Sequence, residues 1–423
     1  MSATARLALY VLLFLSGSAG LAYQTIWTQT FTVALGHELP SLLAVVAAFF
    51  SGLSLGAWSL GARIGRSTYP QRWYAAFELL IAAWAVVGIY LLPHLADYAA
   101  TALGVQPLPI VQWSAAFLLP FVALLPATFA MGATLPAMEQ VLSRRTAHGQ
   151  VVGGTYAANT AGAMIGVVVS VFLLLPTLGQ QGTLLLFAAV NVVCAVGAIS
   201  LGGGRSVPIA ATPSQPPPTL DARPLAWLLF ATGLLGIGYE VLAVRVMSQV
   251  FEGTLYSFAT ALVVYLAASS AGAGVFQRYA AQMAAPAWLS RLLLGLAYSC
   301  LVGMFVLYGA RDLYRTLRLT VGDSALAVFV SELTLALSVY LLPSFLMGMT
   351  FALLTQRARQ VRGDIGHALG VNTLGGALAP ALFAVLLLPL IGAKWSFGLL
   401  AFTYLVLLPL PSKTEGAIGW WPR

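Results

Sequence analysis

Apolar runs of about 20 residues recur along the whole chain, and each is long enough to cross a lipid bilayer as an α-helix. Only 8% of the residues are charged, against about 25% in soluble domains. The sequence therefore predicts an all-α polytopic membrane protein with about 12 transmembrane helices, whose first partner is the lipid bilayer. The predicted spans are residues 7–33, 39–62, 73–94, 111–138, 151–176, 182–201, 225–247, 254–276, 288–309, 325–354, 367–390 and 395–411.

The chain contains two copies of one six-span unit. The segment SGSAGLAYQTIWTQ at 16–29 aligns with TGLLGIGYEVLAVR at 232–245, an offset of 216 residues. Near the end of the fifth span, Gly179 recurs 213 residues later as Gly392. Because six is an even number, the two copies share one orientation. Parallel six-helix repeats are the layout of major-facilitator transporters, whose substrate path lies between the two halves.

Between the two copies the sequence is no longer apolar, and this stretch divides the chain into two repeats and a linker. A stretch rich in proline, glycine and serine is typical of an irregular linker. The predicted parts are a first six-helix repeat at 1–201, a cytoplasmic linker at 202–224 and a second six-helix repeat at 225–423.

The distribution of basic residues predicts the orientation, because Lys and Arg gather on the cytoplasmic side of membrane proteins. With the N-terminus placed in the cytoplasm, 15 of the 20 Lys and Arg residues fall on that side. Both termini are therefore predicted to be cytoplasmic. The exception is the basic segment 310–323, which predicts a short amphipathic helix on the outer interface. The net charge of +8 follows this topology, and no basic cluster with interleaved aromatics predicts a nucleic-acid partner.

One charged pair lies inside an apolar span of the second repeat. Glu240 and Arg245 occupy the positions where the first repeat has Gln24 and Gln29. Both charges are replaced together by neutral amides, which predicts that the two positions share an environment. Direct pairing stays open, because five residues along a helix give about 7.5 Å of rise and about 140° of rotation. We expect the two side chains to face the interior, where they stabilise or gate a polar path.

Two further acids break the symmetry of the repeat. Glu78 has Leu294 as its counterpart, and Glu332 falls opposite a position near Ala115. A carboxylate inside a membrane span is a candidate for handling protons or cations. The alternative is a protonated or paired acid that joins helices.

Amide and aromatic side chains at matching positions in the two repeats give four more candidates. Asn159 and Asn372 could line a substrate path or form interhelical hydrogen bonds. Tyr23 and Tyr239 belong, with Trp27, Trp58 and Tyr265, to a set of aromatics that could line a cation pocket, or could pack in the core or face lipid.

No pattern in the sequence predicts catalysis, a metal site or a cofactor. The histidines are scattered, and Cys194 and Cys300 lie in apolar runs without a CxxC neighbour. The glycine run at 201–205 is followed by prolines rather than by a helix, so it does not predict a nucleotide site. The chain is therefore predicted not to be an enzyme.

Several segments together resemble the membrane portion of the fused major-facilitator/spermidine synthase family. They are SGSAGLAYQTIW, TGLLGIGYEVLAVR, FFSGLSLGAWSLGARIGR, FELLIAAW, LPATFAMGATLPAM and GTYAANTAGAMIGVVVSVFLLLPTLG. The resemblance covers nearly the whole chain, and because this family is bacterial it implies a location in a bacterial inner membrane. Two departures accompany it: Gln24 and Gln29 stand where the family usually has Glu and Arg, and no GGGDG-like turn of an aminopropyltransferase domain is present.

Two functions are therefore expected. The first is a transporter-like protein that moves or binds polyamines or another small cation, with carboxylates supplying negative charge. The second is a non-catalytic membrane anchor or scaffold for a separately encoded spermidine synthase-like enzyme or a larger membrane complex.

Overall fold

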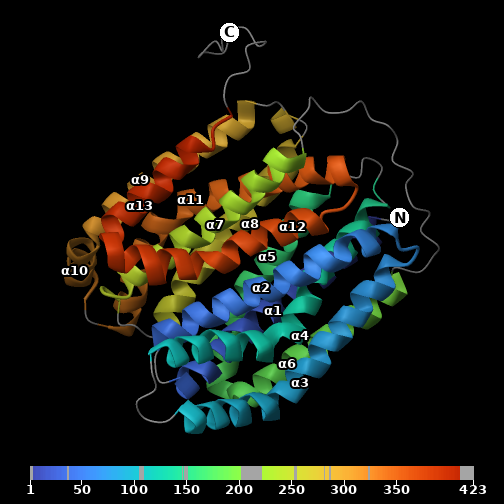
Figure 1. Cartoon of the computed structure of the whole chain (residues 1–423), viewed down its shortest axis with the longest axis horizontal. Coiled ribbons are helices and arrows are strands. Elements are labelled where there is room, and N and C mark those ends of the chain that lie inside the picture. Colours follow the sequence, from blue (N-terminus) through green and yellow to red (C-terminus); the bar gives the residue numbers. More distant parts are fainter. Residues whose placement is uncertain are drawn as a thin grey trace.

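The computed structural model describes residues 3–35, 38–103, 109–144, 146, 151–201, 222–251, 255–280, 282–284, 287–322 and 324–409. Within these ranges all regular structure is helical (Figure 1). The predicted linker lies outside the described residues, except for 222–224, which belong to a helix.

The first repeat forms six long helices. They are α1 (Ala3–Leu35), α2 (Glu38–Arg66), α3 (Pro70–Leu103), α4 (Pro109–Ser143), α5 (Val152–Val169) and α6 (Leu175–Leu201), with the π-helical turn η1 (Ser170–Leu174) between the last two.

The second repeat forms the same set with one short helix added. Its elements are α7 (Ala222–Met247), α8 (Leu255–Tyr279), η2 (Gln282–Ala284), α9 (Ala287–Tyr308), α10 (Ala310–Val321), α11 (Ala325–Arg362), α12 (Gly366–Ala379), η3 (Pro380–Leu387) and α13 (Leu388–Val406). The added helix α10 is the amphipathic helix predicted at 310–323, and it packs against α9 and α11.

Ten helical segments among the described residues are long and apolar enough to cross a membrane. Two of them, Val152–Leu201 and Gly366–Val406, contain 50 and 41 residues, whereas one crossing needs about 20. Each of the two turns sharply at a glycine with positive φ: Gly179 (φ 67°, ψ −176°) and Gly392 (φ 76°, ψ 169°). This backbone region is essentially open to glycine alone. Both segments therefore cross twice, which gives the twelve predicted spans.

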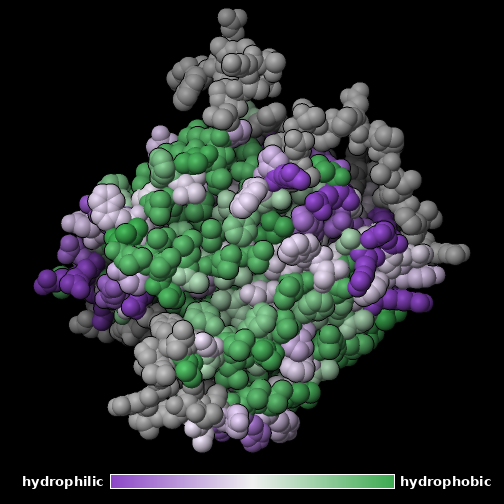
Figure 2. Space-filling view, viewed as in Figure 1, coloured by the Kyte–Doolittle hydropathy of each residue, from purple (hydrophilic) through white to green (hydrophobic). Residues whose placement is uncertain are grey.

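The surface of the molecule fits a bilayer. Figure 2 shows a broad hydrophobic face between two opposite ends where hydrophilic residues gather. Large apolar side chains are exposed on several outer helices, among them Val87 of α3, Val193 of α6 and Leu342 of α11. In a helix bundle of this composition, such side chains face lipid rather than water.

Glycines let the helices within each half approach closely, and the contacts recur in both repeats. A Cβ atom at Gly132 of α4 would overlap the backbone oxygen of Leu53 on α2, and one at Gly348 of α11 would overlap that of Ser269 on α8. Small residues at such crossings are typical of membrane helix packing.

We expect Gly132→Ala to destabilise the protein by about 1–3 kcal/mol, because a methyl group there must displace the α2 backbone. The measurement is thermal unfolding of the purified protein in detergent. Gly398→Ala on α13 is the control, since a Cβ at that position meets nothing within 4 Å. An unchanged midpoint for Gly132→Ala would contradict this account of the α2–α4 crossing.

The two halves meet along two symmetric pairs of helices. α2 of the first half packs against α12 of the second, and α5 packs against α8. Figure 1 shows the blue-to-green helices and the yellow-to-red helices as adjacent groups that meet at these elements. The seam between the halves holds the candidate site.

Candidate functional site

A cavity of about 650 Å³ lies between the two halves. Helices α1, α2, α4, α5 and α6 contribute most of its wall from the first half, and α7, α8, α11 and α12 contribute most of its wall from the second. This volume suits a small organic ligand. Much of the wall is apolar, including Leu21, Phe49, Phe50, Leu53 and Leu262.

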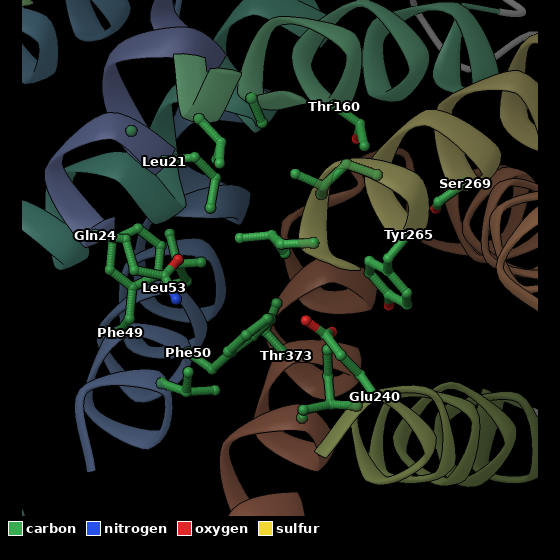
Figure 3. A pocket seen from close by; sticks show the side chains of 18 of the residues that line it. Leu21, Gln24, Phe49, Phe50, Leu53, Thr160, Glu240, Tyr265, Ser269 and Thr373 are labelled. Atoms are coloured by element: carbon green, nitrogen blue, oxygen red, sulfur yellow. The ribbon is translucent and has the colours of Figure 1, made fainter. Parts of the chain in front are cut away.

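Six of the ten predicted site residues line this cavity. Glu240 and Arg245 come from α7, and their counterparts in the first repeat come from α1. Figure 3 shows Glu240 and Tyr265 facing Gln24 and Phe49 across the open space. The six residues are Gln24, Gln29, Asn159, Glu240, Arg245 and Asn372.

Glu240 and Arg245 are the charged residues in the described wall of the cavity. The backbone carbonyl of Glu240 accepts a hydrogen bond of 3.2 Å from the Tyr340 hydroxyl. Its side-chain carboxylate points into the cavity (Figure 3). No ion pair joins Glu240 to Arg245 in the part of the chain that the structure describes. The two residues therefore share the cavity without pairing directly.

Both asparagines line the cavity, and Asn372 also forms an interhelical hydrogen bond. Asn372 of α12 lines the cavity, and its Nδ2 donates a hydrogen bond of 2.8 Å to the Leu229 carbonyl on α7. Asn159 of α5 lines the cavity from the other half, and its backbone lies against Gly17 of α1. Each asparagine thus sits at a close helix crossing at the edge of the cavity.

Glu78 of α3 lies one layer behind the cavity wall and is fully buried. The hydroxyl of Ser16 donates to its Oε1 at 2.5 Å, and Nδ2 of Asn191 donates to its Oε2 at 2.6 Å. Both donors line the cavity. Tyr23 completes the cluster, because its hydroxyl donates to Asn191 Oδ1 at 2.7 Å.

The remaining predicted residues lie away from the cavity wall. Glu332 of α11 is buried and accepts a hydrogen bond of 2.7 Å from Ser257 of α8. Tyr239 is buried too, and its hydroxyl donates to the Val339 carbonyl at 2.8 Å. Tyr23 stacks on Trp27, with ring centroids 5.3 Å apart. The expectation that Tyr23 and Tyr239 line a cation pocket is corrected here: both rings pack between helices within their own half.

The sequence prediction missed two polar residues that line the cavity, Asn191 and Tyr156. Asn191 is the amide in an otherwise apolar stretch of α6, and such a residue is a signal in itself. Tyr265 of α8 was not missed: it belongs to the predicted set of aromatics, and it lines the cavity beside Glu240 (Figure 3). Tyr156 of α5 shares a hydrogen bond of 3.3 Å with Ser269 of α8, which joins the two halves.

The cavity is closed at the end of the molecule that carries the start of α1. A buried apolar cluster from both halves forms its floor: Ala57, Val152, Phe351, Ile365 and Leu369. At the opposite end the wall reaches Val33 and Gln180, which are exposed. Access is therefore from one side.

Beyond the floor, polar contacts hold the two halves together. Arg359 of α11 forms an ion pair of 2.5 Å with Glu139 of α4, and Nε2 of Gln140 donates to the Gly363 carbonyl at 3.3 Å. Glu139 is fully buried, whereas the Arg359 side chain is 18% exposed. Glu139 falls one residue beyond the predicted span 111–138, so the sequence analysis did not consider it.

No protein-family model matches the chain, and no curated protein is significantly similar to it in sequence. Solved structures are similar over nearly the whole chain. The human organic anion transporter MFSD10 is 15% identical, with 95% of this chain and 98% of that chain covered and a TM-score of 0.59. A bacterial homologue of the iron transporter ferroportin in an outward-facing state is 14% identical, with 96% of each chain covered and a TM-score of 0.60. The nucleoside transporter NupG is 14% identical, with 96% and 97% covered and a TM-score of 0.54.

At these identities the likeness establishes the fold. The chain has the major-facilitator architecture, so the predicted fold class is confirmed. Its long apolar helices are those of a multi-pass membrane protein.

Proposed function

We propose that the chain is a carrier for a small organic cation with one positive charge and a largely apolar body. The observation that supports this is the carboxylate of Glu240, which projects into a mostly apolar cavity between the halves. A bound ammonium group would pair with Glu240, and the apolar wall would receive the rest of the solute. Tyr265 beside it offers an aromatic ring to a cation. A carrier function agrees with the prediction that the chain is not an enzyme.

The number of charged residues in the cavity wall indicates what charge the bound cation would carry. Glu240 is the sole carboxylate among the described lining residues, and Arg245 adds a positive charge. A trivalent polyamine would leave two ammonium groups without a counter-charge in a cavity of low polarity, which is costly. We therefore favour a monovalent cation over spermidine.

The proposed orientation places the closed end of the cavity in the cytoplasm. Arg63, Arg66, Arg278, Arg359 and Arg362 lie at the helix ends on that side, and basic residues favour the cytoplasmic side. The cavity would then open to the outside of a bacterial inner membrane, with the N-terminus in the cytoplasm.

The proposal predicts saturable uptake of labelled phenyltrimethylammonium into proteoliposomes that hold the purified protein. This cation is permanently charged, so it does not leak through the lipid as a neutral amine. Excess unlabelled phenyltrimethylammonium should reduce the uptake at least about tenfold, whereas the same excess of spermidine should leave it within about twofold.

Phenylalanine is the third compound in the test, because a zwitterion could use Arg245 as well as Glu240. If phenylalanine competes and the two cations do not, the substrate would be a zwitterion rather than a cation. Competition by spermidine would restore the polyamine interpretation. No uptake of any of the three would contradict the carrier proposal.

The resemblance to the fused spermidine synthase family and the scaffold alternative remain predictions. No contact among the described residues favours a cytoplasmic enzyme or a membrane-complex subunit as a partner. A protein without transport activity that retains a synthase-like protein in a pull-down would support the scaffold alternative.

A further inference from the structure

The cluster around Glu78 lies in the half opposite to Glu240 and has the features of a separate functional group. Glu78 is fully buried, and the described residues show no Lys, Arg or His paired with it. Its two oxygens instead receive hydrogen bonds from Ser16 and Asn191. Burying a carboxylate without a counter-charge costs far more than burying the neutral acid. Such a position is suited to take up and release a proton.

The surroundings of Glu78 contain no competing fixed charge. The titratable groups that face it are Tyr23 of α1, Tyr74 of α3 and Cys194 of α6. The neighbouring helix α4 carries one titratable residue in its described part, Glu139, which is already paired with Arg359 at the closed end. The charge at this position therefore depends only on whether the Glu78 carboxyl group holds a proton.

The second repeat shows what the same position looks like without this group. At the offsets of the repeat, Leu294 replaces Glu78 and Tyr404 replaces Asn191. The acid and its amide partner are absent together. A pair that served only to join α3 to α6 could have remained in both halves. The joint loss suggests that the two residues work as a unit in one half.

Ser16 links Glu78 to the cavity. Its Oγ is 2.5 Å from Glu78 Oε1, and the residue lines the cavity wall. A hydronium ion in the cavity can donate a proton to Ser16 Oγ while the original Ser16 proton moves to Oε1, which leaves a water molecule and the neutral acid; release to a water reverses both transfers. No other co-reactant is needed. The neutral acid keeps its hydrogen bond, because it then donates to the serine oxygen.

We infer that Glu78 is a proton-binding site, distinct from the substrate carboxylate Glu240, and that the carrier exchanges protons for organic cations. This inference rests on the proposed function. Helix α1 supplies the physical link between the two sites. It holds Ser16 and Tyr23 toward Glu78, and it presents Gln24 to the cavity opposite Glu240 (Figure 3).

The test separates coupled from uncoupled transport in proteoliposomes with phenyltrimethylammonium as the probe. In the wild type, a pH gradient with the acidic side inside should drive accumulation, and exchange of labelled for unlabelled probe should proceed without a gradient. In Glu78→Gln, which mimics the neutral acid, gradient-driven accumulation should fall at least about tenfold while exchange stays within about twofold. A helix-joining role alone would not separate these two readouts.

Ser16→Ala is the second variant, since it keeps the carboxylate and removes the hydroxyl that faces the cavity. Its gradient-driven rate should fall several-fold, and Ser16→Thr should restore it. Gradient-driven accumulation that survives in Glu78→Gln would overturn the inference, as would parallel loss of accumulation and exchange in both variants. If the wild type exchanges labelled for unlabelled probe but a pH gradient drives no accumulation, the proton inference would be overturned and the proposed function would stand. Absence of exchange in the wild type would overturn the proposed function itself.

Discussion

Arg359→Gln should open the closed end of this protein. The substitution leaves the fully buried Glu139 without its partner, and removing one member of a buried ion pair costs about 3–5 kcal/mol. Because the pair joins α4 of one half to α11 of the other, that cost falls on the closed arrangement. A change of about 3 kcal/mol shifts a two-state equilibrium by roughly 100-fold. We therefore expect the form that is closed at this end to be no longer the more populated of the two.

Spin labels at Arg63 of α2 and Arg362 of α11 would measure the opening. Both side chains are exposed, and they stand on opposite halves at the closed end. Pulsed electron paramagnetic resonance should show a longer distance between the two spin labels in Arg359→Gln than in the labelled parent protein.

Two matched variants control for the charge pair. Glu139→Gln should have a smaller effect, because the Arg359 side chain is 18% exposed and can extend to water. In the double variant Arg359→Gln with Glu139→Gln, most molecules should again show the short distance between the labels, since no buried charge remains. Identical distance distributions in all four proteins would show that the pair does not hold the halves together.

Glu240→Gln should abolish most transport of phenyltrimethylammonium. Removing one partner of a desolvated charge pair costs about 2–5 kcal/mol, a loss of roughly 30-fold or more in affinity. Arg245→Gln should change the affinity by less than about threefold, because the structure shows no contact through which Arg245 holds Glu240 in place. Equilibrium binding in detergent measures both effects.

The double variant with Gln at both positions reproduces Gln24 and Gln29 of the first repeat. A direct ion pair would make this double variant recover part of what Glu240→Gln loses. The geometry instead predicts that it binds as poorly as Glu240→Gln alone, since no ion pair joins the two residues. Recovery in the double variant would show that the pair forms in another conformation. Thermal midpoints of all three variants control for misfolding.

The backbone plan of this protein could be predicted from the sequence because it depends on length and repetition. Runs of about 20 apolar residues define the spans. The recurrence of Gly179 as Gly392 marks the two places where a helix turns back, and the structure shows positive φ at both. Both features can be found by reading along the chain, without knowing which residues meet in space.

The assignment of side chains to the cavity could be predicted only in part. In a membrane span nearly every face is apolar, so periodicity does not reveal which face looks inward. Glu240 and Gln24 stood out because they are polar. Tyr23 and Tyr239 were candidates in the sequence for either a pocket or the core, and each packs within its own half. The Glu139–Arg359 pair joins residues 220 positions apart, and nothing local in the sequence links them.

The turns at Gly179 and Gly392 limit how the open side of the cavity can shut. At each turn one residue joins two membrane spans, so the rim there has no loop long enough to fold over the opening. The helices involved, α5 and α12, are also the ones that form the seam with α8 and α2. Occlusion must therefore come from tilting whole helical hairpins, and its speed should respond to bilayer thickness and lateral pressure.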